Sequence, residues 1–315
     1  MAHRAAPGIF LGMPMPTYQV QPLDIGRTGN FQLTADEYHS IERSVQVFVH
    51  TIWQEEKFRI LVENYVSFYD FILSEGLTHV LDARKEIDTL HFRLGSASRH
   101  VMNFLTSFRL YRDALKENTA CIFGDKNAEK APLEKLKEVY DNDFAYRMIH
   151  QLRNHAQHCA LPVQRGSFGS VWNDERTRYS IKNNFFVDYD ALKRDQGFPE
   201  KLLDEARRNY SSLDLFTLLG TGLDTLGEIH HWWRYHCGDI LLNAERTFGK
   251  FFERVRSERY DETNVFVKIV DIDTGERLRE ISSFQFSYLD HLRSIIAEPR
   301  GLGKRRIEIP DPRDI

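Results

Sequence analysis

The stretch IDTLHFRLGSASRHVMNFLTSFRLYRDALKE, residues 87–117, decides the fold class of this chain. Its apolar residues recur at spacings that alternate between three and four without a miss. Because an α-helix turns once every 3.6 residues, these side chains share one narrow stripe, which is typical of antiparallel helix packing. We predict a helix from about Ala83 to Glu117. The stripe consists of Ile87, Leu90, Leu94, Ala97, Val101, Phe104, Phe108, Tyr111 and Leu115.

Helical patterns continue on both sides of this stretch. A first helix is predicted from about Ala35 to Ser74, with Thr34 or Asp36 as its cap and Gly76 as its end. A third helix begins near Pro132, bends near residues 141–143 and ends before Pro162. A last helical region covers residues 200–258. We expect it to break at Ser211, Ser212 and Gly220.

Two segments have the shorter period of β-strands. Residues 163–198 contain alternating apolar stretches and glycines, and predict a hairpin or irregular insertion placed to cover or shape a site. Residues 265–286 alternate around Asp273-Thr274-Gly275 and predict a second hairpin. The predicted fold is therefore mostly α, an antiparallel helical bundle with two small β-hairpins. The predicted parts are an N-terminal arm (1–30), the bundle with its insertion (31–260), and a C-terminal hairpin with a basic tail (261–315).

Composition limits the class of protein. The chain has 315 residues, 42% apolar and 28% charged, which is typical of a globular protein with ample core. Its net charge of −4 gives no global basic field, so nucleic-acid binding would need a local patch. The three cysteines are far apart and fit neither a disulfide framework nor a zinc site. The sequence lacks an apolar run of membrane-helix length and an apolar signal core, so we expect a cytoplasmic protein without membrane contact.

The candidate site lies near the end of the third helix, in Arg153-Asn154-His155-Ala156-Gln157-His158. On a helical wheel of residues 145–159, one arc is apolar and holds Ala145, Met148, Ile149, Leu152, Ala156 and Cys159. The opposite arc contains only cations, imidazoles and amides, and no carboxylate, so it suits an anion. It consists of Arg147, His150, Arg153, Asn154, Gln157 and His158.

These residue types can process a phosphodiester. An arginine holds a phosphate through two donors of fixed geometry, and a histidine can accept or donate a proton near neutral pH. Together they are enough to cut RNA without a metal. The alternative for Arg153 and His158 is a structural pair that closes the helix end. His155 lies at the edge of the apolar arc, and we expect it to be packed and hydrogen-bonded instead.

The Arg-Asn-x-x-x-His pattern on the third long helix of a helical bundle resembles the catalytic motif of HEPN-domain ribonucleases. The resemblance implies that Arg153 binds the scissile phosphate, that His158 acts on the 2′-hydroxyl or the leaving group, and that Asn154 orients the phosphate or the histidine. It also implies a homodimer with a composite site and no cofactor or metal. Some toxins of this family carry a modified tyrosine two residues after the histidine; here that position is Ala160.

The residues and the resemblance together predict a metal-independent endoribonuclease. The resemblance alone implies a toxin or defence effector with a regulatory partner protein. Arg147, His150 and Gln157 are expected to bind substrate. The need for both a proton acceptor and a proton donor is a separate reason to expect a homodimer. A first alternative is a non-catalytic RNA- or nucleotide-binding or scaffold protein that uses the same face. A second is a metalloprotein built on the cluster 230–236, where aromatic packing at an interface is the competing interpretation.

Overall fold

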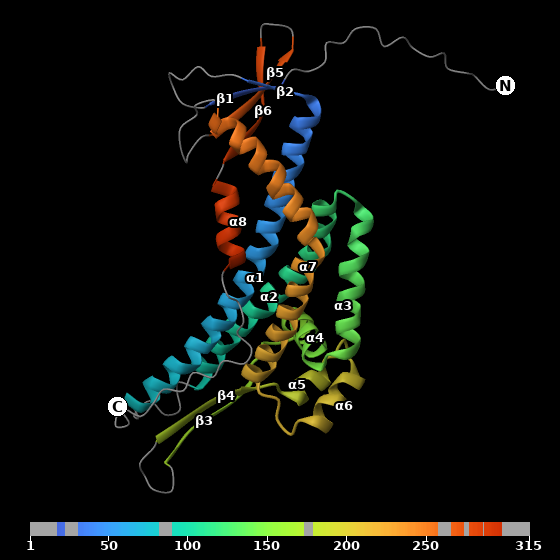
Figure 1. Ribbon diagram of the computed structural model, residues 1–315. Coiled ribbons are helices and arrows are strands. Elements are labelled where there is room, and N and C mark those ends of the chain that lie inside the picture. The colour runs from blue at the N-terminus through green and yellow to red at the C-terminus, as the bar shows by residue number, and fades with distance from the viewer. Residues whose placement is uncertain are drawn as a thin grey trace, which may run out of the picture. The chain divides into compact units, whose positions relative to one another are not determined.

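The structure is a computed structural model that describes residues 18–22, 31–81, 90–172, 179–257, 266–273, 277–285 and 287–297. The chain divides into two compact units. The smaller unit combines residues 1–49 with 238–296, and the larger one combines residues 50–237 with 297–315. Helices predominate in the described residues (Figure 1), which confirms the predicted mostly α-helical bundle.

The larger unit contains the predicted bundle and the motif helix. Two long helices, α1 and α7, each continue into the smaller unit. In Figure 1, α3 lies beside α2, and α4, α5 and α6 gather near its end. The helices are α1 (Ala35–Leu81), α2 (Leu90–Phe123), α3 (Lys130–Asn142), α4 (Phe144–His158), α5 (Tyr189–Arg194), α6 (Glu200–Asn209) and α7 (Leu215–Ser257), with a short 3-10 turn η1 (Lys126–Glu129) before α3.

The stripe that decided the fold class is the buried side of α2. Its last six members are all buried, while Leu90, at the beginning of the helix, is exposed. The predicted start at Ala83 and the stripe residue Ile87 lie outside the described residues. The helix extends past the predicted end at Glu117 to Phe123. The buried members are Ala97, Val101, Phe104, Phe108, Tyr111 and Leu115.

Two glycines predicted to interrupt helices do not do so. Helix α1 continues through Gly76 to Leu81, and α7 continues through Gly220. One helical glycine costs only about 1 kcal/mol relative to alanine, which tertiary packing can offset. In α7, a Cβ on Gly220 would lie 2.7 Å from the Tyr65 hydroxyl. A Cβ on Gly222 would overlap Ile149 of the motif helix. Gly220 and Gly222 therefore permit close helix packing.

The predicted bend near residues 141–143 is a complete helix boundary. Asp143 ends α3 with an extended backbone and is the N-cap of α4. One of its carboxylate oxygens accepts a hydrogen bond from the backbone N–H of Tyr146, and the other accepts one from the Thr225 hydroxyl at 3.1 Å. Asp143 thus fixes the start of the motif helix and ties it to α7.

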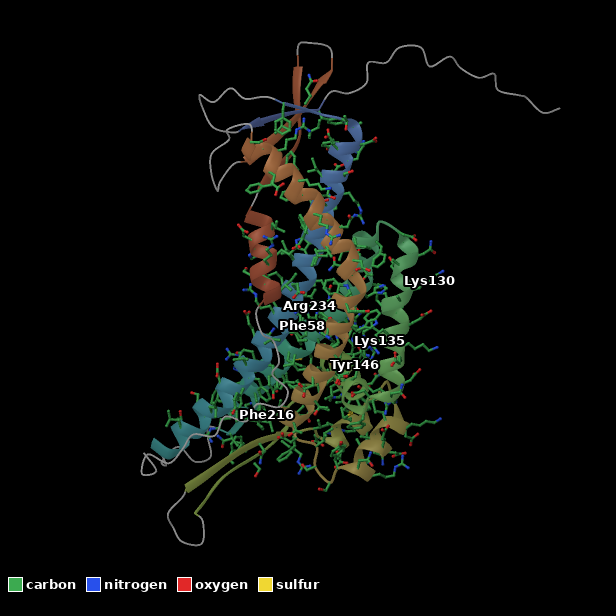
Figure 2. All side chains as sticks on the ribbon, in the orientation of Figure 1. Phe58, Lys130, Lys135, Tyr146, Phe216 and Arg234 are labelled. Atoms are coloured by element: carbon green, nitrogen blue, oxygen red, sulfur yellow. The ribbon has the colours of Figure 1, made fainter. Side chains whose placement is uncertain are left out.

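A buried polar network joins α1, α2 and α7 in the interior of the larger unit. The Glu55 carboxylate forms an ion pair with Arg234 (2.6 Å) and contacts His230 (3.1 Å), which also contacts the Tyr111 hydroxyl at 3.2 Å. The His230 ring stacks on Phe58 with centroids 4.1 Å apart. Figure 2 labels Phe58 and Arg234 of this network. His230 therefore packs at a helix interface, which supports the packing interpretation of the cluster 230–236.

The predicted insertion contains the expected hairpin and one unexpected helix. Strands β3 (Arg165–Trp172) and β4 (Tyr179–Phe186) pair antiparallel. Helix α5 follows, because the Asp188 carboxylate accepts hydrogen bonds from the backbone N–H groups of Asp190 and Ala191. The predicted break near Ser211 is confirmed, since α6 ends at Asn209 and α7 begins at Leu215.

The smaller unit contains a four-stranded antiparallel sheet in the order β2-β1-β5-β6. Its elements are β1 (Tyr18–Pro22), β2 (Phe31–Leu33), β5 (Phe266–Asp273), β6 (Arg277–Gln285) and α8 (Ser287–Ala297). The second predicted hairpin exists, but it belongs to this larger sheet. Part of the predicted arm is strand β1, whose pairing with β5 was invisible to a local pattern. The basic tail lies outside the described residues.

Thr34 caps α1 as predicted, through a reciprocal pair with Glu37. The Thr34 hydroxyl accepts from the Glu37 N–H at 3.2 Å, and the Glu37 carboxylate accepts from the Thr34 N–H at 2.8 Å. In the described residues, none of the helices combines the length and the apolar character that crossing a membrane requires.

Candidate functional site

Helix α4 separates its residues into a packed side and a polar side, as the wheel predicted. Of the predicted apolar arc, Ala145, Met148, Ile149 and Leu152 are buried, and Ala156 is partly exposed. Cys159, placed on the apolar arc from sequence, is exposed. The reason is local: α4 ends at His158, and the backbone of Cys159 leaves helical geometry with φ −124° and ψ −61°. The wheel was extended one residue too far.

Arg153 and Asn154, the first two residues of the motif, are half-buried and form long hydrogen bonds. The Arg153 guanidinium donates to the Asn154 side-chain oxygen at 3.4 Å. The Asn154 amide donates to Gln151 at 3.4 Å. Hydrogen bonds of this length are weak, so a bound anion can replace them at little cost.

His158 and Gln157 are exposed at the end of α4. The described structure contains no hydrogen bond or ion pair between Arg153 and His158. Five positions along a helix correspond to a rotation of about 140°, so the two side chains point to different sides of the polar face. Within a single chain, a phosphate can therefore contact Arg153 or His158 more readily than both side chains at once.

Arg147 has a partner that the wheel could not show. Its guanidinium holds the Glu205 carboxylate of α6 with two bonds of 2.8 and 3.0 Å. It also donates to the backbone carbonyls of Tyr140 and Asp141 at the end of α3. The polar face has no carboxylate of its own, but α6 supplies one. Arg147 therefore joins α4 to α3 and α6, and a phosphate would compete with Glu205 for it.

His150 and Arg153 lie beside two arginines of α2 that sequence analysis missed. Burial, followed by the charges of Arg112 and Arg109, lowers the pKa of His150 to about 4. Burial and then the charge of Arg109 lower the pKa of Arg153. Asp113 pairs with Arg109 and with Arg112, both at 2.8 Å. At neutral pH His150 is therefore a neutral imidazole next to a cluster of three arginines and one carboxylate.

This cluster borders a pocket between α2, α3 and α4 with a volume of about 300 Å³. Burial raises the pKa of Tyr146, one of its walls, to about 12, so the phenol remains protonated. Figure 2 labels Tyr146 in this region. The pocket is at the small end of the range for small-molecule sites, and its cations exceed its carboxylates. Its lining consists of Arg112, Asp113, Lys116, Leu133, Leu136, Lys137, Tyr140 and Tyr146.

His155 is packed and hydrogen-bonded, which confirms its prediction. Only 4% of the residue is exposed, and its Nδ1 lies 2.8 Å from the Asp195 carboxylate. Asp195 directly follows α5. Sequence analysis missed it, because forty residues separate the two partners and no local pattern links them.

No protein-family model matches this chain, and neither does any curated protein or any solved structure. The proposed function therefore rests on the residues of α4 and their surroundings.

Proposed function

We propose that this protein is a metal-independent endoribonuclease of the HEPN type that acts as a homodimer. The observation that carries the proposal is the end of α4. There, the exposed His158 shares a polar helix face with Arg153, which lies in an arginine cluster with Arg109 and Arg112. Such a face combines local positive charge with an imidazole, a side chain that serves as general acid or base in catalysis.

In the proposed reaction, Arg153 holds the scissile phosphate while Asn154 orients it. His158 accepts the proton of the 2′-hydroxyl, whose oxygen attacks phosphorus. The bond from phosphorus to the 5′-oxygen breaks, and that oxygen takes a proton from the second copy's His158. The products are a 2′,3′-cyclic phosphate and a 5′-hydroxyl. Proton transfers of this kind each contribute about 10²- to 10⁴-fold in rate.

The surrounding residues fit supporting roles. Gln157 is exposed beside His158 and can donate to phosphate or ribose oxygens. His150, as a neutral imidazole, can donate a hydrogen bond without carrying charge. Arg147 would contribute only if phosphate displaced Glu205. The resemblance also suggests a toxin or defence effector that a partner protein regulates, and we propose that it acts in the cytoplasm.

The experiment incubates purified protein with a labelled RNA in excess EDTA and compares two substitutions. Arg153→Ala and His158→Ala should each abolish cleavage while leaving the melting temperature unchanged, because neither side chain fills the core. The matched controls are Arg208→Ala and His231→Ala, which remove an exposed arginine and an exposed histidine of other helices. Cleavage that survives His158→Ala would overturn the assignment.

A second candidate function is the binding of RNA or a nucleotide without cleavage. The specific observation in its favour is the pocket beside Arg112, which contains three cationic side chains, two tyrosines and one carboxylate. A nucleotide could place its phosphate on the cations and its base against tyrosine. This function predicts intact RNA in the same assay. It also predicts that Arg112→Ala and Lys137→Ala weaken binding, whereas His158→Ala does not.

A further inference from the structure

A second cluster of chemically active side chains lies at the end of α4, on another side from the arginine cluster. His155 belongs to the last turn of α4, and Cys159 is its C-terminal cap. The backbone leaves helical geometry at Cys159, so the position of its thiol is set by this turn and not by the helical repeat. Asp195 reaches them from the end of α5. The His155 nitrogen, the Cys159 sulfur and an Asp195 oxygen all lie within 4.8 Å of one another.

Two of these three side chains are held in place. His155 is buried, and its Nδ1 lies 2.8 Å from Oδ2 of Asp195. The other oxygen of Asp195 accepts a hydrogen bond from the backbone N–H of Gly197 at 2.9 Å. The Gly197 N–H lies outside the cluster, and an outer partner of this kind orients a metal ligand in proteins. Cys159 is exposed, so an ion could reach the cluster from solvent and the thiol could rotate towards it.

The chemistry of the three ligands suits zinc. Zinc takes nitrogen, thiolate sulfur and carboxylate oxygen at about 2.0–2.3 Å in tetrahedral geometry, which places ligand atoms roughly 3.2–3.8 Å apart. The three ligand atoms lie within 4.8 Å of one another, which is about 1 Å beyond the upper end of this spacing. A thiolate and a carboxylate also balance the charge of a divalent ion while the imidazole stays neutral. The space beside His155 is lined mainly by apolar residues, which favours a neutral site; they are Leu152, Leu161, Pro162, Val187, Ala191 and Leu192.

We propose that His155, Cys159 and Asp195 bind a divalent transition-metal ion of the zinc type, with water in the fourth position. On binding, the Cys159 thiol releases its proton, the imidazole carries its proton on Nε2 so that Nδ1 is free to bind, and all three groups turn to the ion. The ion would clamp the end of α4 to the end of α5. This site is separate from the proposed RNA chemistry, which needs no metal. Because His158 directly precedes Cys159, a bound ion would also steady that residue.

Cobalt is the probe, because Co²⁺ replaces Zn²⁺ and its bond to thiolate absorbs in the near ultraviolet. Protein stripped with a chelator and then freed of it is titrated with Co²⁺. We expect one equivalent per chain to produce a thiolate charge-transfer band that Zn²⁺ abolishes. Cys159→Ala should remove the band, and this substitution is safe for folding because Cys159 is exposed. Asp195→Asn should also remove or weaken it.

Two control substitutions show whether the band comes from this cluster. Cys121→Ala should keep the band, since that thiol lies outside the cluster. His158→Ala should keep it as well, so the result is independent of whether the protein cleaves RNA. Zn²⁺ should raise the melting temperature of the wild type but not that of Cys159→Ala. Absence of the band in the wild type, or a band that persists in Cys159→Ala, would overturn the proposal.

Discussion

The substitution His155→Ala distinguishes a structural histidine from a catalytic one within the same motif. His155 is 4% exposed and contacts Asp195 at 2.8 Å, whereas His158 is exposed. Loss of a hydrogen bond to a charged group costs about 1.5–3 kcal/mol, and the space left by a buried ring adds to that loss. We therefore expect His155→Ala to lower the free energy of unfolding by about 3 kcal/mol.

The measurement is thermal unfolding followed by circular dichroism, in EDTA so that no metal contributes. For a unit of the size of residues 50–237, 1 kcal/mol shifts the melting temperature by about 2–4 °C, so the expected fall is about 6–12 °C. RNA cleavage, measured well below the midpoint, should remain within a few-fold of the wild type. His158→Ala should instead keep the melting temperature and lose RNA cleavage. A His155→Ala protein that is fully stable but inactive would refute the division of roles.

Three further predictions concern other parts of the larger unit. Glu55→Gln should lower the free energy of unfolding by about 3–5 kcal/mol in urea titrations, because it leaves the Arg234 charge without its buried partner. The control Glu56→Gln removes a partly exposed ion pair with Arg59 and should cost under about 1 kcal/mol. Equal losses in the two variants would contradict the argument. The pKa of His150 should be about 4 by NMR titration and should rise in Arg112→Ala. Because the unfolded imidazole takes up its proton near pH 6.5, the His150 contribution should weaken stability as pH falls from 6.5 towards 4; an unshifted His150 would argue against the cluster. Mixing wild-type and His158→Ala protomers under exchange should reduce specific activity close to the square of the wild-type fraction, whereas a straight line would mean that each chain carries a complete site.

The helices could be predicted from the sequence where the spacing of the apolar residues matches the side of the helix that is buried. The stripe of α2 repeats over many turns, so its buried side followed directly from the spacing. The boundary at Asp143 was visible as a bend because its neighbours are polar. Gly76 and Gly220 misled the prediction, since the cost of a helical glycine is small and its value for close packing depends on a distant residue such as Tyr65.

The candidate site divides in the same way. The polar and buried sides of α4, including the packed His155, followed from the wheel because they depend on one helix. The partners did not: Glu205 on Arg147, Asp195 on His155 and Arg112 beside His150 all come from other elements. The helical wheel includes only the residues of α4 itself, so it showed a polar face without carboxylates. In the folded chain, other elements place carboxylates next to this face. The cluster of His155, Cys159 and Asp195 could not be predicted either, because the position of Cys159 depends on the residue at which α4 ends.

The most direct test of the proposed chemistry is the nature of the RNA ends produced in excess EDTA. The wild-type protein should yield fragments that end in a 2′,3′-cyclic phosphate and begin with a 5′-hydroxyl. Arg153→Ala and His158→Ala should yield none, and His231→Ala should match the wild type. Fragments with a 3′-hydroxyl, or cleavage that EDTA abolishes and Mg²⁺ restores, would contradict the account.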